Sequence, residues 1–264
     1  MTRRVALVTG AARGIGAACA VALARTGYVV VAADDCGRRP YRPCGHSGTG
    51  PSLTDLERVV AECGDEAEGA AVDVADGEAM IRLCARIARQ RGRLDVAVGA
   101  AGTIDGGQPI WRTSLSSAEE LFRVNAMGAW NTARAAIPYL LASPRPELAR
   151  LVIVTSAAAQ RGLFHLPAYT VAKHAALGVV RAAAADLTGT GVAAVAVSPG
   201  CTETPMLHAT AELYGCDTSE LLSHQALRRP ISPEEVARAV LFAVSPDGAA
   251  LTGSILAVEG GFGG

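Results

Sequence analysis

The sequence has little net charge, no long hydrophobic run and no Cys-x-x-Cys pair. Its 264 residues carry a formal net charge of −1 without a long run of one sign, which argues against nucleic acid and anionic membranes as partners. No apolar run approaches the roughly 20 residues that a membrane span needs. The start, MTRRVALVTGAARG, has too short an apolar run for a signal peptide and ends in a glycine loop. We therefore expect a cytoplasmic protein.

The seven cysteines form no recognisable disulfide or metal pattern. Their number is odd, and in a cytoplasmic chain we expect free thiols, several of them buried. Cys36, Cys44 and His46 lie close together in one segment. Three such ligands without a fourth at a known spacing make a weak case for a metal, so we assign none and leave the role of this segment open.

Apolar β-branched segments alternate with longer alanine-rich segments of helical period. This alternation predicts an α/β fold, a doubly wound parallel seven-stranded Rossmann-type sheet with helices on both faces, in a single domain of residues 1–264. The expected strands are Val5–Thr9, Tyr28–Ala33, Gly69–Val74, Leu94–Val98, Leu151–Thr155, Val192–Val197 and Ser254–Val258. The expected helices begin near Ile15, Thr54, Asp76, Ser116, Pro167 and Pro233.

Two segments interrupt this alternation. Residues 36–53, CGRRPYRPCGHSGTGPSL, are rich in Gly, Pro and Arg and have no usable periodicity, so we expect an inserted loop. Residues 201–230 form a second long insert before the last helix, with alternating apolar and polar residues. Long inserts in compact domains are usually functional or disordered, and we expect a short helical lid here.

The stretch TGAARGIG, residues 9–16, lies between the first strand and the first helix. Its three glycines permit a tight turn and a close approach to a pyrophosphate, and the helix N-terminus offers free N–H groups and the positive end of its dipole. A glycine motif alone is weak evidence, but the required strand–loop–helix context is present. We therefore expect a dinucleotide site that includes Gly10, Arg13, Gly14, Ile15 and Gly16.

Asp34 ends the second strand, about 20 residues beyond the glycine loop, where a Rossmann fold places an acid against the adenosine ribose. A carboxylate there repels the 2′-phosphate of NADP, so we expect NAD as the cofactor. Arg13 is a counter-signal because it can pair with a phosphate, but the acid stands at the discriminating position itself. The 36–53 loop follows directly and begins beside the adenosine.

Tyr169 and Lys173 stand four residues apart in YTVAK, so on a helix their Cβ atoms are about 5–6 Å apart. A cation held close to a phenol favours the phenolate and lowers its pKa. Such a phenol can accept a proton from an alcohol while hydride leaves the carbon, or donate one to a carbonyl. Ser156 follows a strand at the ligand-binding edge of the sheet, where its hydroxyl can hold the substrate oxygen.

With these motifs the chain resembles the single-domain branch of the short-chain dehydrogenase/reductase superfamily over essentially its whole length. The resemblance rests on TGAARGIG, VDVAD at 72–76, VGAAG at 98–102, VNAMG at 124–128, Ser156, YTVAK and VSPGCTETPM at 197–206. It implies that Tyr169 is the acid/base, that Lys173 holds the nicotinamide ribose and lowers the tyrosine pKa, and that Ser156 orients the substrate. It also implies that Asn125 supports a water-linked proton path to Lys173.

The resemblance further implies cofactor contacts outside the glycine loop. These are Asp73 and Val74 at the adenine, Ala101 and Gly102 where the cofactor approaches, Pro199, Gly200 and Thr202 beside the nicotinamide, and Thr204 near the pyrophosphate. One departure is Gly99-Ala100-Ala101-Gly102, which stands where the family usually has Asn-Asn-Ala-Gly. The missing amides put the local rigidity of the central strands in doubt more than the chemistry.

A closer resemblance is to the mycofactocin-associated subgroup. It rests on the loop after AADDC, on GGQPIW at 106–111 and on TPMLHATAELYG at 204–215. It implies an NAD-dependent alcohol dehydrogenase whose inserted loop retains the cofactor, with a peptide-derived redox carrier as the hydride acceptor. The family likeness also implies a homotetramer.

The expected substrate wall is apolar, which favours a hydrophobic alcohol or ketone over a sugar phosphate. Its candidates are Trp111, Leu163, Phe164, His165, Met206, Leu207, Leu213 and Tyr214. Most of them can equally be core or interface residues, and His165 can equally be a packing histidine.

Three other functions are compatible with parts of this pattern. A biosynthetic ketoreductase with exchangeable NAD(P)H would share every motif. A nucleotide-sugar epimerase or dehydratase also uses a Tyr–Lys pair, but it usually needs a separate substrate region for which this chain has little room. An inactive nucleotide-sensing protein is disfavoured because Asn125, Ser156, Tyr169 and Lys173 are all present.

Overall fold

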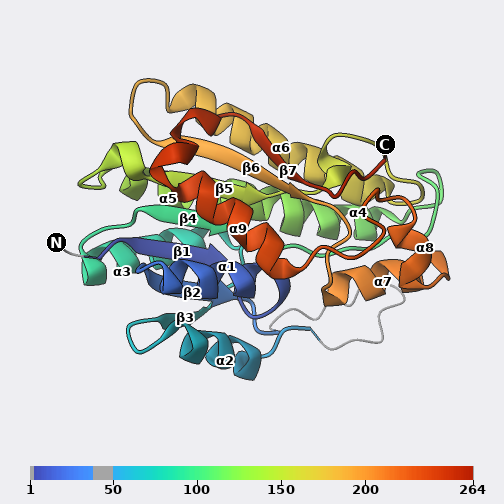
Figure 1. Ribbon diagram of the computed structural model, residues 1–264, viewed down its shortest axis with the longest axis horizontal. Helices are drawn as coiled ribbons and strands as arrows, with labels where there is room; N and C mark the ends of the chain where they lie inside the picture. The colour runs from blue at the N-terminus through green and yellow to red at the C-terminus, as the bar shows by residue number, and fades with distance from the viewer. Residues whose placement is uncertain (1–2, 38–49, 264) are drawn as a thin grey trace.

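Seven parallel strands in the order β3-β2-β1-β4-β5-β6-β7 form the centre of the computed structural model, which describes residues 3–37 and 50–263 (Figure 1). The strands are β1 (Val5–Thr9), β2 (Val29–Asp34), β3 (Glu68–Ala71), β4 (Val96–Gly99), β5 (Arg150–Val154), β6 (Ala193–Pro199) and β7 (Ile255–Val258). The predicted Rossmann-type fold is confirmed, and the expected strands differ from the observed ones by at most three residues at either end.

Helices cover both faces of this sheet. They are α1 (Gly14–Arg25), α2 (Leu53–Cys63), α3 (Gly77–Arg91), α4 (Leu115–Leu121), α5 (Gly128–Leu141), α6 (Pro167–Asp186), α7 (Pro205–Tyr214), α8 (Thr218–Leu222) and α9 (Pro233–Val244). Alternate strand residues point to opposite faces, so Val5 and Leu7 pack with α3, α5 and α6, whereas Ala6 and Val8 pack with α1, α2 and α9. These two apolar layers form the core.

The strand order reverses between β1 and β4, because β1 pairs with β2 on one side and with β4 on the other. In open α/β sheets, ligands bind beyond the carboxyl ends of the strands at such a switch point. The glycine loop after β1 and the segment after β4 both lie there. Helices α7 and α8 also lie at this end of the sheet (Figure 1).

The helix expected from Ser116 is interrupted by one π-helical turn, η1 (Phe122–Met127), which lies between α4 and α5. Three short 3₁₀ segments, η2 (Pro146–Leu148), η3 (Ala157–Ala159) and η4 (Pro246–Leu251), were not expected either. The second insert contains α7 and α8, in agreement with a helical segment within 201–230. Among residues 3–37 and 50–263, no helix has the length and apolar character that a membrane span requires.

Most of the 36–53 insert lies outside the described residues, including Cys44 and His46. At its end the predicted boundary is wrong by one residue, because α2 already begins at Leu53. Ser52 caps this helix: its hydroxyl accepts a hydrogen bond from Asp55 N–H, and the Asp55 carboxylate accepts one from Ser52 N–H. This capping box fixes the helix start in a region without hydrophobic periodicity.

Candidate active site

Tyr169 and Lys173 lie one turn apart on α6, and both side chains are buried, with 6% and 5% of their surface exposed. Lys173 Nζ lies 5.7 Å from the centre of the Tyr169 ring and donates a hydrogen bond to the carbonyl of Val154 at 3.3 Å. Val154 is the last residue of β5, so the lysine is anchored at the carboxyl edge of the sheet. The pair therefore lies at the expected ligand edge rather than on an outer surface.

The expected lowering of the tyrosine pKa is not found in this structure. Burial raises the pKa of Tyr169 to about 12, and a hydrogen bond with Ser156 offsets only part of that effect. Burial also lowers the pKa of Lys173 to about 8. Both shifts have one cause, because a low-dielectric surrounding disfavours the phenolate and the ammonium alike. At neutral pH the tyrosine is therefore fully protonated.

Asn125 lies in the π-helical turn η1 and is buried. Its Nδ2 donates to Thr103 O at 2.9 Å, and its Oδ1 accepts from Thr103 N–H at 3.1 Å. A Cβ built on Gly102 would lie 2.9 Å from Asn125 Oδ1 and 3.4 Å from Lys173 Nζ. The structure therefore brings Gly102, Asn125 and Lys173 together. Single π-turns are frequent at functional sites, and no periodicity in the sequence predicts this one.

Ser156 follows β5 and caps the short helix η3, where its Oγ accepts a hydrogen bond from Ala158 N–H at 3.1 Å. The same hydroxyl lies within hydrogen-bonding reach of Tyr169. The cap fixes the position of the serine next to the phenol. Three separate segments thus bring four side chains together beyond the carboxyl end of β5: Asn125, Ser156, Tyr169 and Lys173.

The glycine loop approaches β4 so closely that no side chain fits between them. Gly10 has φ +67°, and a Cβ there would lie 2.6 Å from the backbone of Ala101. Helix α1 begins at Gly14 and directs its free N–H groups into this space, and a Cβ built on Gly14 would lie 3.1 Å from Thr204 Cγ2. A backbone cradle at a helix N-terminus fits the pyrophosphate of a dinucleotide, with Thr204 beside it.

Asp34 is buried at the end of β2, and its Oδ2 accepts a hydrogen bond from Ala12 N–H at 3.0 Å. Burial raises its pKa, and the Ala12 hydrogen bond opposes that shift. The carboxylate therefore braces the glycine loop from the side where the adenosine ribose of a bound dinucleotide would lie. Arg13, the other residue weighed for cofactor choice, is an exposed residue immediately before α1.

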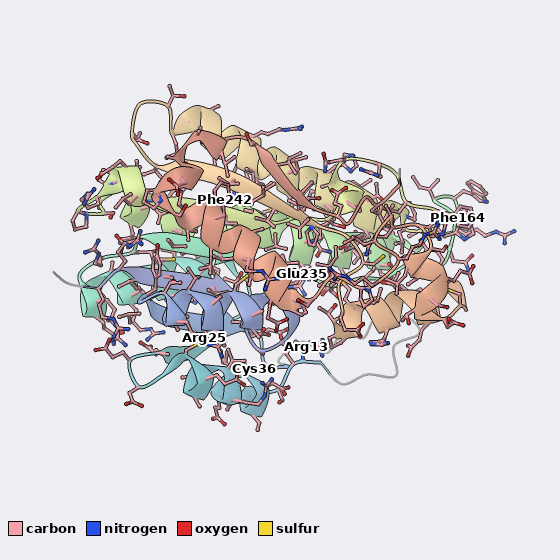
Figure 2. The ribbon with its side chains drawn as sticks, in the orientation of Figure 1. Arg13, Arg25, Cys36, Phe164, Glu235 and Phe242 are labelled. Carbon is pink, nitrogen blue, oxygen red and sulfur yellow. The ribbon has the colours of Figure 1, made fainter. Side chains whose placement is uncertain are left out.

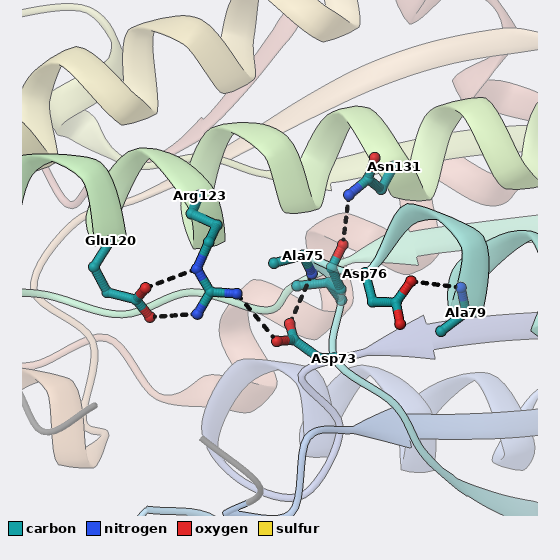
Figure 3. Close-up of polar contacts among 8 residues, drawn as sticks. Asp73, Ala75, Asp76, Ala79, Glu120, Arg123 and Asn131 are labelled. Carbon is teal, nitrogen blue, oxygen red and sulfur yellow. Dashed lines mark hydrogen bonds and ion pairs between the residues drawn. The ribbon is translucent and has the colours of Figure 1, made fainter. Parts of the chain in front are cut away.

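Asp73 and Val74 lie after β3, where η1 and α5 contact them. Figure 3 shows the contacts of Asp73, Arg123 and Asn131. Asp73 Oδ1 accepts from Ala75 N–H at 2.7 Å, and its other oxygen lies 3.3 Å from Arg123 Nη1. Arg123 also binds Glu120 of α4 through two hydrogen bonds. Val74 O accepts from Asn131 Nδ2 of α5 at 2.9 Å. This turn follows β3, next to the strand that carries Asp34.

An apolar cluster surrounds the Tyr169 side chain on the substrate side. Met206 of α7 belongs to it, and Tyr169 OH points toward Met206 Sδ at 3.9 Å. The cluster consists of Ile104, Leu121, Ala158, Leu166, Tyr169 and Ala209, with Leu163, Ala168, Met206, Leu213 and Tyr214 packed against it. Sequence reasoning missed Ile104 and Leu166. Ile104 stands two residues after the VGAAG motif and Leu166 three residues before Tyr169, and these positions were the available signals.

Among the other substrate candidates, Trp111 and Phe164 lie at the surface, whereas Leu207 is buried. Trp111 and Phe164 are 80% and 75% exposed, and Figure 2 shows Phe164 at the periphery of the molecule. Phe164 stacks on His165 with ring centres 3.7 Å apart, and the His165 carbonyl accepts from Gly107 N–H at 2.8 Å. Tyr214 OH donates to Phe164 O, which ties α7 to this loop, and Leu207 is buried in α7. His165 has φ +52°, an uncommon conformation for a residue with a Cβ.

The departure at residues 99–102 has a visible consequence in the core. A Cβ on Gly99 would lie 2.7 Å from Ile153 Cδ1 of β5, so a neighbouring side chain occupies the space that a larger residue would need. Pro199, Gly200 and Thr202 continue from β6 along the same edge. Within residues 3–37 and 50–263, no group of three His, Cys, Asp or Glu residues is arranged to hold a metal.

Comparisons with known proteins agree with this geometry. Residues 10–263 match the family model described as enoyl-(acyl carrier protein) reductase. A cis-4-hydroxycyclohexanecarboxylate dehydrogenase of Sinomonas cyclohexanicum is 30% identical over 259 residues, 98% of this chain and 96% of that protein. A Streptomyces virginiae protein, named for a ketoacyl reductase of monensin polyketide synthase, is 33% identical over 276 residues. The match covers 99% of this chain and 98% of that protein.

One similar solved structure is the carveol dehydrogenase of Mycobacterium avium in complex with NAD. It is 27% identical, with a TM-score of 0.89, and the match covers 98% of this chain and 96% of that one. The residues described above fit the shared architecture. The glycine loop follows β1, Asp34 ends β2 and braces this loop, and Tyr169 is itself a buried member of the apolar cluster.

Proposed function

The chain belongs to the short-chain dehydrogenase/reductase family of NAD(P)-dependent oxidoreductases, and on that premise we propose that it interconverts a hydrophobic alcohol and the corresponding ketone with NAD(H). The observation that carries this proposal is the convergence of Asn125, Ser156, Tyr169 and Lys173 between a glycine cradle and an apolar cluster. A phenol in this position can exchange a proton with a substrate oxygen.

When bound, the nicotinamide would supply or accept the hydride. Tyr169 OH would then donate its proton to the carbonyl oxygen in reduction, and in oxidation the Tyr169 phenolate would accept the alcohol proton. The Ser156 hydroxyl would hold the same oxygen, since it already lies within hydrogen-bonding reach of the phenol. Lys173 would contact the nicotinamide ribose from the position fixed by Val154 O, and Asn125 would support proton supply to Lys173.

NAD rather than NADP is favoured by the buried Asp34 carboxylate, because a 2′-phosphate placed beside it would meet charge repulsion in a region of low dielectric. An apolar substrate is favoured by the cluster around Tyr169, whose described members carry no charged side chain. Burying an unpaired charged group there would cost roughly several kcal/mol. Burying apolar surface of the substrate would instead gain about 25 cal/mol per Å².

Turnover itself tests this function. Purified protein is given NADH or NADPH with a panel of cyclic and acyclic ketones, and NAD⁺ with the matching alcohols, while absorbance of the reduced nicotinamide is followed. We expect turnover with NAD(H) and higher kcat/KM for apolar members than for phosphorylated or carboxylated ones. Turnover only with charged substrates would contradict the proposed substrate class.

We further propose that NAD is held tightly and that a mycofactocin-type, peptide-derived carrier removes the hydride. The supporting observation is the position of the 36–53 insert, which begins two residues after Asp34, the last residue of β2. The test is extensive dialysis of protein purified without added nucleotide, denaturation, and mass spectrometry of what is released. Release of near-stoichiometric NAD or NADH supports retention of the cofactor. An empty protein favours the alternative function, a biosynthetic ketoreductase with exchangeable NAD(P)H. The similarity to a ketoacyl reductase supports that alternative.

We also propose that the protein is a homotetramer in which a second copy covers an apolar face formed by α4, η1, α5 and α6. Large apolar side chains are exposed on these elements: Leu115 is 74%, Phe122 42%, Trp130 51% and Val171 55% exposed. A groove of about 580 Å³ runs between α4, η1 and the start of α6. Exposed apolar surface of this kind usually marks an interface. Light scattering on the intact protein and on Trp130→Glu tests it; a monomeric wild type would contradict the proposal.

A further inference from the structure

The segment after β7 contacts the loop that carries Phe164 and His165. Glu259 directly follows β7, and its side chain is only 8% exposed. Its Oε1 accepts hydrogen bonds from Ser198 Oγ at 2.6 Å and from Gln160 Nε2 at 2.9 Å, and its Oε2 accepts one from Arg161 Nη2 at 3.1 Å. A buried carboxylate with three donors forms a strong connection, because charge-assisted hydrogen bonds gain strength away from water.

The same C-terminal segment pairs with the end of the helical insert. Leu227 N–H donates to Gly260 O at 3.0 Å, and Gly263 N–H donates to His224 O at 2.9 Å. The Arg161 guanidinium also donates to Phe262 O. Residues 259–263 therefore join the substrate-side loop 160–166 to residues 224–227, which follow α8.

Gln225 extends this connection to the nicotinamide side. Its side chain is 1% exposed, and its Oε1 accepts from Cys201 N–H at 3.0 Å. A Cβ on Gly200 would lie 2.8 Å from Gln225 Oε1 and 2.6 Å from Glu259 O. Gly200 and Cys201 are thus held between Gln225 and the backbone of Glu259, and the next residue, Thr202, pairs with Ile231.

We propose that Glu259 and Gln225 are positioning residues with separate tasks, which rests on the oxidoreductase function proposed above. Glu259, through Arg161, sets the position of the 160–166 loop and so affects the substrate. Gln225, through Cys201 N–H, sets the position of residues 200–202 and so affects the nicotinamide. Within the described part of the chain, neither side chain forms a hydrogen bond with Tyr169, so both act on the reaction through the segments that they hold.

Kinetics on the full chain separate the two tasks. Arg161→Gln removes the charged partner of Glu259, and we expect the KM for the alcohol or ketone to rise about tenfold, with kcat and the NADH Kd within about twofold of wild type. Gln225→Met removes the acceptor of Cys201 N–H, and we expect the NADH Kd to rise about fivefold with a fall in kcat. Arg161→Lys keeps the charge and should recover most of the substrate KM. Arg58→Gln is the control, because it breaks only the exposed Arg58–Glu62 pair on α2.

Unchanged KM and Kd in folded Arg161→Gln and Gln225→Met would overturn the proposal. Equal losses of kcat, KM and thermal stability in both variants would also overturn it, since they indicate a structural role alone. Hydrogen–deuterium exchange gives a readout that needs no turnover: Arg161→Gln should raise exchange in 160–166, and Gln225→Met in 200–202. If wild type reduces no ketone and oxidises no alcohol, the proposed function fails. The positioning claim is tested independently of turnover, because unaltered exchange of these two segments in the two variants would overturn it.

Discussion

Lys173 Nζ and the Tyr169 ring are 5.7 Å apart, and burial shifts the pKa values of the two groups in opposite directions, to about 8 and about 12. The surroundings thus favour the neutral form of each group. The tyrosine of this structure is ready to donate a proton, as ketone reduction requires. Alcohol oxidation requires a phenolate, so it needs additional stabilisation of that form by the bound cofactor and substrate.

The buried lysine should lower the stability of the protein. Its pKa of about 8 lies below the ordinary 10.5, so the unfolded chain binds more protons between these values, and the free energy of unfolding rises with pH across this window. At pH 7 we therefore expect Lys173→Met to be more stable than wild type by on the order of 3 kcal/mol, because one pKa unit is worth about 1.4 kcal/mol.

Thermal unfolding at pH 7, 8, 9 and 10 checks this expectation. The advantage of Lys173→Met should be largest at pH 7 and shrink steadily between pH 8 and pH 10.5. An advantage that stays constant over this range would show that packing, and not the buried charge, distinguishes the two proteins. Above pH 10 both proteins should lose stability, because the Tyr169 pKa of about 12 exceeds its ordinary value of 10.

Asp34→Asn should reduce the preference for NADH over NADPH. The asparagine Oδ1 can still accept the hydrogen bond from Ala12 N–H, so the glycine loop keeps its brace while the negative charge is lost. We expect NADH to bind about tenfold more weakly than in wild type, because a charged hydrogen bond to the ribose is lost. We expect NADPH to bind more tightly, because the carboxylate no longer repels its 2′-phosphate. Fluorescence titration with both nucleotides measures the ratio, and Asp65→Asn, at an exposed position after α2, is the control that should leave it nearly unchanged.

Arg123→Gln should weaken cofactor binding without altering the chemical step. Arg123 joins Asp73 to Glu120, and its removal loosens the turn that holds Asp73 and Val74 (Figure 3). Because the arginine is 44% exposed, the effect should be small, about threefold in the NADH Kd, with kcat unchanged. Arg134→Gln breaks a comparable exposed pair with Glu78 and serves as the control. An equal shift in both variants would mean that general surface charge is responsible.

Local sequence signals predicted the parts of the fold that depend on one strand or one loop. The alternation of apolar strands and amphipathic helices was sufficient for the seven-stranded sheet, and the TGAARGIG loop lies where its glycines require. Asn125, Ser156, Tyr169 and Lys173 also lie together near the carboxyl edge of the sheet, while the roles that the resemblance implies for them stay predictions.

What the sequence did not predict depends on contacts between distant segments. The pKa of Tyr169 follows from burial by the cluster around Ile104 and Leu166, which no pairwise spacing reveals. The π-turn at Asn125 has no pattern of its own. The Glu259–Arg161 contact joins residues 98 positions apart, and only the folded chain brings them together.

The central claim is that the Tyr169 hydroxyl exchanges the proton with the substrate, and Tyr169→Phe tests it most directly. NADH binding and ketone-dependent NADH oxidation are measured on this variant and on the control Tyr139→Phe. Tyr139 belongs to α5, and its side chain packs against the core. We expect Tyr169→Phe to bind NADH within about twofold of wild type while kcat falls at least about 10²-fold, as loss of a general acid predicts, and Tyr139→Phe to remain active. Undiminished turnover in Tyr169→Phe with intact NADH binding would contradict the mechanism.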